Sequence, residues 1–336
     1  MTPLLEATLA RIEPADADCE AAARSAFDAK TKPRGSLGRL EDLAAQICAI
    51  RRTTELDRLR SVVVVAAGDH GVTVEGVSAY PSEVTRQMLA NFDADGAAVC
   101  VLARRAGAGL HVVDAGVGTP TGNIAETAAM SGDAAVASVE RGIECANELA
   151  LDGVDVVGLG EMGIGNSTVA AAVAAALLGV DPAQVCGRGT GLDDAGVARK
   201  VDVVGRALRA NAGREPLAVL AGLGGFELAF LCGLALGTAA QHMVVLLDGF
   251  ISSTAALLAA RLRPAASASM ISAHLSPEPG HRLVLDALAL EPLLDLELRL
   301  GEGSGAALAL PLLDAAVALL TEMATFAEAG VTDAGR

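Results

Sequence analysis

Val62-Val63-Val64-Val65-Ala66-Ala67-Gly68-Asp69-His70-Gly71 is the stretch of this sequence that decides the fold. It is a short apolar run without polar alternation, and it ends in a polar loop that contains glycine. Similar runs recur at 110–113, 154–159, 217–221, 243–247 and 269–272, with alanine-rich helical patterns between them. Unalternated apolar strands separated by helices are typical of a parallel sheet buried on both faces. The sequence therefore predicts an α/β fold, a Rossmann-like parallel sheet flanked by helices.

The two ends of the chain have a different pattern. Apolar residues recur at helical spacing through the first 55 residues, and a helical pattern returns from Gly305 to about Ala329, with Pro311 as a kink or restart. We predict a large domain of residues 56–300 and a small helical domain of residues 1–55 plus 301–336. In the break at 30–36, Ser36 is a candidate helix cap. Lys32 and Arg34 in this break fit either a solvated turn or an anion contact.

The composition is that of a packed globular enzyme that does not bind polyanions. Of 336 residues, 52% are hydrophobic and the formal net charge is −16, so the protein's field would repel nucleic acid and anionic membrane. The most apolar run, 228–247, contains Gln241 and His242 and is expected to be a core helix followed by a strand. Residues 1–11 lack a signal-peptide pattern, so we expect a cytoplasmic protein. The cysteines and histidines show no ligand spacing, and no metal site is predicted.

Glu302 is the candidate catalytic base. It lies between glycines at 301, 303 and 305, which let the backbone bend and let a ligand approach closely. The apolar residues 306–310 that follow would form a dry wall, which raises the proton affinity of a carboxylate. The alternative interpretation is a simple helix entry, with Glu302 near the positive end of the helix dipole and Ser304 as the cap.

The segment 160–167 is a candidate phosphate loop. It nearly matches the phosphate-binding pattern of nucleoside triphosphatases, but Asn166 occupies the position of the essential lysine. A single phosphate on the backbone N–H groups of a helix start fits better, with the hydroxyl of Ser167 nearby. Glu161 could balance positive charge that develops on a ribose. A tight strand-to-helix turn without a ligand remains the alternative.

Three further segments carry candidate binding residues. Gly224 and Gly225 form a second helix-start anion site, although the third glycine of a dinucleotide fingerprint is missing. Lys200 follows a glycine-rich loop and could close on a phosphate. Tyr80, the sole tyrosine, offers a flat surface to an aromatic ligand. The candidate phosphate-binding residues are Gly163, Gly165, Asn166, Ser167, Lys200, Gly224 and Gly225, and Ser276 follows the predicted strand at 269–272.

Several of these segments together resemble the nicotinate-nucleotide:dimethylbenzimidazole phosphoribosyltransferases, which make α-ribazole phosphate for the lower ligand of cobalamin. The match runs from about residue 30 to about residue 328. Its segments are 32–41 (KPRGSLGRLE), 67–72 (AGDHGV), 160–166 (GEMGIGN), 247–251 (LDGFI), 272–274 (SAH) and 301–305 (GEGSG).

The resemblance implies a homodimer with a Rossmann-like large domain and a small helical domain built from both chain ends. It implies transfer of phosphoribose from nicotinate mononucleotide to 5,6-dimethylbenzimidazole, with inversion at the anomeric carbon and release of nicotinate. It implies that Glu302 is the general base and Glu161 a second functional glutamate, that Gly163 and Lys200 lie near the nucleotide, and that residues 78–87 lie near the base. On this resemblance we assign the candidate phosphate-binding residues and Ser276 to the nucleotide, and we assign to the base Ser78, Tyr80, Ser82 and Gln87. Ser167 stands where the family usually has a threonine.

The reaction fits the residues that were selected from the sequence. The pyridine leaves as a neutral ring and needs no general acid, so one base suffices, and neither a metal nor another cofactor is required. Two alternatives stay open, a non-catalytic nucleotide- or benzimidazole-binding protein and an NAD-dependent oxidoreductase. The sequence does not decide between dimethylbenzimidazole and a related azole or purine.

Overall fold

The computed structural model describes residues 2–211 and 213–332, so residue 1 and residues 333–336 of the predicted small domain lie outside the described residues. A five-stranded sheet with the order β2-β1-β3-β4-β5 and parallel pairing throughout forms its centre. The strands are β1 (Ser61–Gly68), β2 (Gly109–Gly116), β3 (Val156–Met162), β4 (Val244–Leu247) and β5 (Met270–Ser272). The predicted α/β fold is confirmed. The strand order reverses between β1 and β3, and ligands of such sheets bind beyond the carboxyl ends at this point.

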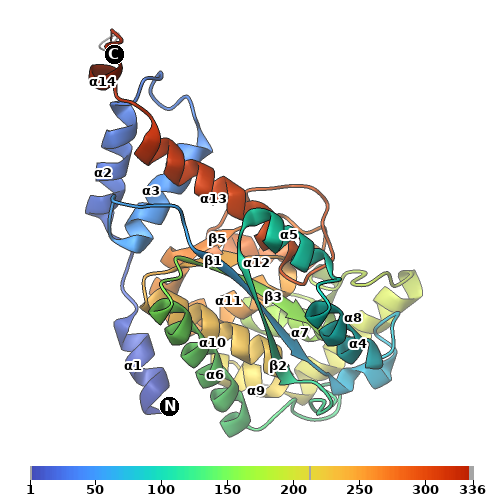
Figure 1. The fold of residues 1–336 in the computed structure, drawn as a ribbon. Helices are drawn as coiled ribbons and strands as arrows, with labels where there is room; N and C mark the ends of the chain where they lie inside the picture. The colour runs from blue at the N-terminus through green and yellow to red at the C-terminus, as the bar shows by residue number, and fades with distance from the viewer. Residues whose placement is uncertain (1, 212, 333–336) are drawn as a thin grey trace.

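Helices cover both faces of the sheet, which is why the strands are apolar without alternation (Figure 1). Along β1, Val64 and Ala66 belong to one core and Val63 and Val65 to the other. The first core is covered by α1 (Pro3–Arg11), α6 (Gly132–Leu151), α7 (Asn166–Leu178), α9 (Pro216–Leu223), α10 (Phe226–Ala240), α11 (Phe250–Leu262) and α12 (Pro279–Leu288). The second is covered by α2 (Ala17–Asp28), α3 (Arg39–Arg51), α4 (Glu83–Asp93), α5 (Ala98–Ala106) and α13 (Ser304–Glu322).

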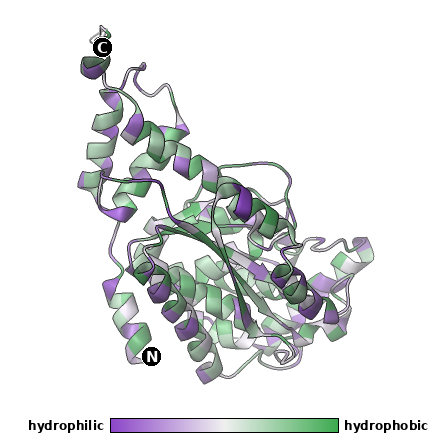
Figure 2. Cartoon of the chain, in the orientation of Figure 1, coloured by the Kyte–Doolittle hydropathy of each residue, from purple (hydrophilic) through white to green (hydrophobic). Residues whose placement is uncertain are grey.

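Burial of the two cores is the main stabilising contribution, since each fully buried valine or leucine side chain contributes about 1.5–3 kcal/mol. Figure 2 shows hydrophobic residues gathered along the strands and on the inward faces of the helices. The helix α8 (Asp194–Ala210) packs on α7 and adds Val203, Val204 and Ala207 to the first core. The remaining elements are α14 (Phe326–Ala329) and the 3-10 helices at Gly71–Glu75, Pro182–Gln184 and Pro264–Ser269.

The helices α6 and α10 approach each other at glycines. A Cβ atom on Gly233 of α10 would collide with the carbonyl oxygen of Val139, and one on Gly142 of α6 would collide with the carbonyl oxygen of Phe230. Both obstacles are backbone atoms, which cannot rotate away. The alanine- and glycine-rich composition of these segments therefore sets a helix separation that larger residues would not allow.

The segment 228–247 and the helix α13 are the most apolar parts of the chain. The first is confirmed as a core helix, α10, followed by the strand β4. By length and mean hydropathy (1.7), α13 could cross a membrane, but 56% of that window is buried within the protein. It packs against β1 and β3 and against α3 and α5. Pro311 lies inside α13, which continues through it.

Two local predictions are wrong. Residues 217–221 are not a strand but part of α9, which begins at Pro216, a favourable residue for the first turn of a helix. A short apolar run fits a buried strand and a buried helix equally well, so periodicity could not separate them. Ser36 does not cap the next helix, since α3 begins at Arg39 and its N-cap is Gly38, with φ of 55°.

The helices α2, α3, α13 and α14 project together from the sheet, whereas α1 lies beside α6 and α10 (Figure 1). Segments from both chain ends meet where the Lys30 ammonium donates to the carbonyl oxygen of Met323 at 2.6 Å. Lys32 is buried and lies 2.8 Å from the carboxylate of Glu41. Arg34 is exposed and 3.9 Å from Asp28. The break at 30–36 thus links the terminal helices.

Candidate active site

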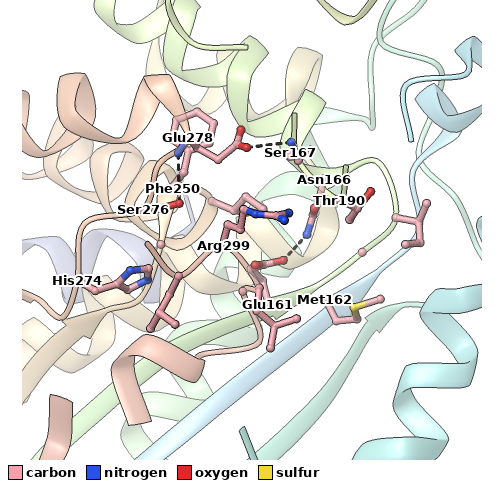
Figure 3. Close-up of a pocket in the computed structure, with 18 residues that line it drawn as sticks. Glu161, Met162, Asn166, Ser167, Thr190, Phe250, His274, Ser276, Glu278 and Arg299 are labelled. Atoms are coloured by element: carbon pink, nitrogen blue, oxygen red, sulfur yellow. Dashed lines mark hydrogen bonds between the residues drawn. The ribbon is translucent and has the colours of Figure 1, made fainter. Parts of the chain in front are cut away.

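A cleft opens at the carboxyl ends of β3, β4 and β5 (Figure 3). Its walls come from the turn after β3, the loops after β4 and β5, and the segment before α13. Five of the predicted site residues line it, namely Glu161, Gly163, Asn166, Ser167 and Ser276. The cleft therefore lies next to the reversal in strand order, where a parallel α/β sheet is expected to bind its ligand.

The turn between β3 and α7 has the geometry of an anion site. β3 ends at Met162 and α7 begins at Asn166, so the predicted strand-to-helix turn is confirmed. A Cβ atom on Gly163 would lie 2.6 Å from the carbonyl oxygen of Gly68, and Gly165 has a φ of 96°, which favours glycine. The first residues of α7 line the cleft. The free N–H groups of this helix start and its dipole favour a negative charge there.

Lys200 lies directly behind this turn. It belongs to α8 and is fully buried, and its ammonium donates to Ser167 Oγ at 3.0 Å and to the carbonyl oxygen of Gly187 at 3.3 Å. Burial lowers the pKa of Lys200, whereas the negative charge of Glu278 raises it. The lysine orients the Ser167 hydroxyl and adds positive charge at the helix start.

Glu161 lies at the end of β3 with 6% of its surface exposed. Its carboxylate accepts a hydrogen bond from the Asn166 side-chain amide (Figure 3). Burial raises the pKa of Glu161 well above its usual value, and the nearby carboxylates of Asp248 and Glu227 raise it further. A carboxyl group in this position holds a proton strongly until positive charge arrives in the cleft.

Glu302 lies in a turn of three consecutive left-handed residues. The φ angles are 83° at Gly301, 63° at Glu302 and 78° at Gly303. For a residue with a side chain this conformation costs about 1–2 kcal/mol. Gly301 and Gly303 have no such penalty, and a Cβ atom on Gly301 would collide with the Glu161 carboxylate. The Ser304 hydroxyl donates to the carbonyl oxygen of Gly301 at 2.7 Å and does not act as the cap of α13.

The side chain of Glu302 is 6% exposed, and one of its oxygens, Oε2, has no hydrogen-bond partner in the described part of the chain. Burial raises the pKa of this carboxyl group, and the charge of Asp248 adds to the effect. The backbone N–H of Val99, in the first turn of α5, lowers it. A buried carboxylate with a free oxygen and a raised proton affinity is suited to accept a proton.

Asp248, the residue after β4, binds the start of α13. Its Oδ1 accepts hydrogen bonds from the N–H groups of Gly305 at 2.6 Å and Ala306 at 3.1 Å, and its Oδ2 accepts one from Gly303 at 3.2 Å. His274 Nε2 lies 3.5 Å from the same carboxylate. Asp248 is thus the cap of α13, supplied by a distant strand instead of by Ser304.

The residues assigned to the aromatic base lie on the segment that leads into α4. Tyr80 is 53% exposed, Gln87 is exposed on α4, and Ser78 and Ser82 are half-buried. The link to the cleft is Thr85, whose hydroxyl accepts a hydrogen bond from the N–H of Ile164 at 3.1 Å. The segment predicted to bind the aromatic base therefore packs directly against the turn between β3 and α7.

Gly224 and Gly225 do not follow a strand, because α9 replaces the predicted one, and they join α9 to α10 beneath the phosphate turn. A Cβ atom on Gly225 would lie 2.5 Å from both the Glu227 carboxylate and the His70 ring. His70 Nε2 is 3.0 Å from Glu227 Oε1, and both side chains are fully buried. These glycines make room for a buried acid–base pair that supports the turn at Gly163.

The sequence matches the family described as phosphoribosyltransferase over residues 12–331. It is 48% identical over 347 residues to the nicotinate-nucleotide–dimethylbenzimidazole phosphoribosyltransferase of Geotalea uraniireducens, with 98% of this chain and 99% of that protein covered. It is 49% identical over 350 residues to the protein of the same name from Geobacter sulfurreducens, with 99% of each covered. The chain belongs to this phosphoribosyltransferase family.

Solved structures of the phosphoribosyltransferase family have the same fold. The crystal structure of CobT from Thermus thermophilus gives a TM-score of 0.90 at 44% identity and covers 94% of this chain and 99% of that one. A second crystal structure, of nicotinate-nucleotide-dimethylbenzimidazole phosphoribosyltransferase from the same organism, gives 0.89 at 43% identity and covers 95% and 99%.

In this phosphoribosyltransferase, several residues at the cleft hold other groups in place. Ser276 lines the cleft as predicted, but its N–H donates to Nδ1 of His281 at 2.9 Å, and burial lowers the pKa of His281 to about 3. Glu278, which also lines the cleft, accepts from the N–H of Gly189 at 2.8 Å. Asp248 follows β4 directly and His274 lies two residues after β5. Their position near the carboxyl ends of strands is the signal that could have selected them.

Proposed function

We propose that this phosphoribosyltransferase transfers the phosphoribosyl group of nicotinate mononucleotide to 5,6-dimethylbenzimidazole and releases nicotinate and α-ribazole 5'-phosphate. Near full-length similarity to relatives that carry the name of this activity supports the proposal. One observation about the site carries it furthest. Glu161 and Glu302 are two buried carboxyl groups with raised pKa, and both are adjacent to Gly301. Glu161 lines the cleft in which we propose that the nucleotide binds.

In the proposal, the donor phosphate binds at the start of α7. Gly163 and Gly165 let the turn pack closely against the loop after β1, the Ser167 hydroxyl donates a hydrogen bond to the phosphate, and Lys200 supplies positive charge through that hydroxyl. The ribose then lies along Asn166 and Ser276, with its anomeric carbon beside Glu161. The Glu161 carboxylate balances the positive charge that the pyridinium ring brings and that develops on the ribose as the ring leaves.

Bond formation needs one proton acceptor. The nitrogen lone pair of the benzimidazole attacks the anomeric carbon, and the bond from that carbon to the pyridinium nitrogen breaks with its electron pair going to the nitrogen. Nicotinate therefore leaves without needing a proton. The N–H proton on the other nitrogen of the benzimidazole goes to Glu302. General-base catalysis contributes about 10²–10⁴-fold, and holding both rings in line contributes up to about 7–11 kcal/mol.

The acceptor base is proposed to lie between Glu302 and the segment of Ser78, Tyr80, Ser82 and Gln87. Thr85 fixes that segment against the phosphate turn, so an acceptor bound there would be close to the donor. We assign to Gly224 and Gly225 the support of the turn, through His70 and Glu227, in place of direct contact with the nucleotide.

We further propose a cytoplasmic homodimer with a small helical domain that is limited to α2, α3, α13 and α14, because α1 of the predicted segment 1–55 packs on α6 and α10 of the large domain. The packing of α2 and α3 with α13 supports this division. Exposed apolar side chains on the segments around the cleft, Val74, Tyr80, Leu296 and Leu300, are suited to a protein interface. Sedimentation of the purified protein tests the dimer, since a monomer at micromolar concentration would contradict it.

The activity is tested by mixing purified protein with nicotinate mononucleotide and 5,6-dimethylbenzimidazole and following nicotinate and α-ribazole 5'-phosphate by chromatography. We expect both products in equal amounts. Stabilisation of the protein by the two substrates without product would identify a binding protein instead. If nicotinate is released with adenine or another azole in place of dimethylbenzimidazole, the proposed identity of the acceptor base must be revised.

A further inference from the structure

The turn that carries Glu302 is held by a residue that is far away in the sequence. Three successive residues, 301–303, have left-handed backbone angles, and such a conformation persists only where the surroundings determine it. The Asp248 carboxylate supplies this constraint, since it accepts the N–H groups of Gly303, Gly305 and Ala306. It is 1% exposed, so water does not replace these bonds.

We propose that Asp248 is the positioning residue for the general base: it fixes the backbone on the C-terminal side of Glu302 and so fixes where the Glu302 carboxylate meets the acceptor. The inference rests on the proposed function, because it concerns the base of that reaction. Asp248 itself faces the turn and not the substrates. Its effect on the reaction is therefore transmitted through Glu302.

A second contribution follows from the charge of Asp248. Two carboxyl groups face Glu302, Asp248 from the end of β4 and Glu161 from the end of β3, and the first turn of α5 faces it with the Val99 N–H. His274, after β5, reaches only the Asp248 carboxylate, at 3.5 Å. The negative charge of Asp248 raises the pKa of Glu302. Removing that charge would shift the acid limb of the pH profile to lower pH, because Glu302 would lose its proton more easily.

The test compares the Asp248→Asn and Asp248→Glu variants with the full-length wild-type protein. In Asp248→Asn, an NH₂ group replaces one of the two carboxylate oxygens. This group cannot accept a hydrogen bond from the backbone N–H groups that it faces, so the turn loses at least one hydrogen bond. We expect kcat to fall on the order of 10²-fold, as a small misplacement of a reacting group does, while the Kd of nicotinate mononucleotide stays within about threefold of wild type. At saturating nucleotide, the acid limb should move to lower pH. Asp248→Glu keeps the charge but not the position, so kcat should fall without that shift.

Hydrogen exchange of the backbone amides gives a measurement that does not depend on activity. Amides 303–306 should exchange faster in Asp248→Asn, while the middle of α13 stays protected. The matched control is Asp314→Asn. Asp314 lies on α13 itself, and its carboxylate accepts a hydrogen bond from the Leu59 N–H at 3.1 Å. This variant should change neither the pH profile nor the exchange of the turn.

Two results would overturn the inference. The first is a kcat and a pH profile of Asp248→Asn that equal those of the wild type. The second is a loss of activity in proportion to the loss of folded protein, while the acid limb of the pH profile and the exchange of amides 303–306 stay unchanged. Failure of the proposed function has a different signature, because the wild-type protein itself would then release no nicotinate. The exchange measurement would still decide whether Asp248 holds the turn.

Discussion

The backbone N–H of Glu302 donates to the carbonyl oxygen of Glu161 at 3.2 Å. This bond joins the end of β3 to the turn before α13, so the two residues with buried carboxyl groups are linked through their backbones. Glu161 lines the cleft, whereas Glu302 is directed toward α5. Each glutamate can therefore be altered and tested separately.

Replacing the proposed base with its amide is expected to stop turnover without preventing binding. Glu302→Gln keeps the size of the side chain but cannot accept the benzimidazole proton, so kcat should fall about 10²–10⁴-fold. The Kd of nicotinate mononucleotide, measured by calorimetry, should stay close to that of the wild-type protein. Turnover at the wild-type rate would exclude Glu302 as the base.

Glu161 should make stability depend on pH. The folded state holds the Glu161 proton above the usual pKa of 4.5, so it binds more protons than the unfolded chain there. Stability is fully present below that value and falls as pH rises through the raised pKa. The side chain introduced by Glu161→Gln does not titrate, so the melting temperature of this variant should rise relative to that of the wild type as the pH increases above 4.5. A difference that shrinks with rising pH would contradict the assignment.

Lys200 should matter for the donor phosphate. Lys200→Met removes the charge behind Ser167 and the hydrogen bond to it. Because a hydrogen bond to a charged group contributes about 1.5–3 kcal/mol and 1.4 kcal/mol is about a factor of ten, the KM for nicotinate mononucleotide should rise about 10- to 100-fold. The neighbouring Arg199, whose guanidinium donates to the carbonyl oxygen of Gly76, provides the control. Arg199→Ala should leave this KM nearly unchanged, and equal effects of the two variants would contradict the prediction.

The contact of α6 with α10 should be intolerant of one added methyl group. Gly233→Ala would push a Cβ atom against the Val139 carbonyl, and overpacking of this kind costs about 1–3 kcal/mol or more. In Gly205→Ala, on α8, the added Cβ atom would meet only the end of the Arg209 side chain at 3.5 Å. That variant should gain up to about 1 kcal/mol, because alanine is the better helix former. Urea unfolding of both variants tests the pair, and equal midpoints would show that the helices can separate.

Much of the fold could be predicted from the sequence because β1, β3, β4 and β5 are buried on both faces, whereas β2 is a partly exposed edge strand. Val62–Val65 shows no alternation, since odd and even residues both enter a core. The same property explains the error at 217–221, where a buried helix has the same apolar pattern as a buried strand. Strand order was not predictable, because it depends on which strands pair and not on local pattern.

The candidate site was predicted in part for a similar reason. Glu161, the Gly163 turn and Glu302 are adjacent to glycines that mark close backbone approach, which a sequence displays. The contact of Asp248 with Gly303 and Gly305 is a tertiary contact between segments that are far apart in the chain. An aspartate after a strand fits many roles, and only the fold shows which backbone N–H groups it meets.

The position of α13 has a consequence for synthesis on the ribosome. This helix follows all five strands in the chain, yet it covers the face that carries Val63, Val65, Val244 and Leu246. While the strands emerge and begin to pair, α13 does not yet cover that face. Exposed apolar surface promotes aggregation of incomplete chains. Translation that pauses between β5 and α13 should therefore increase capture of the nascent chain by chaperones.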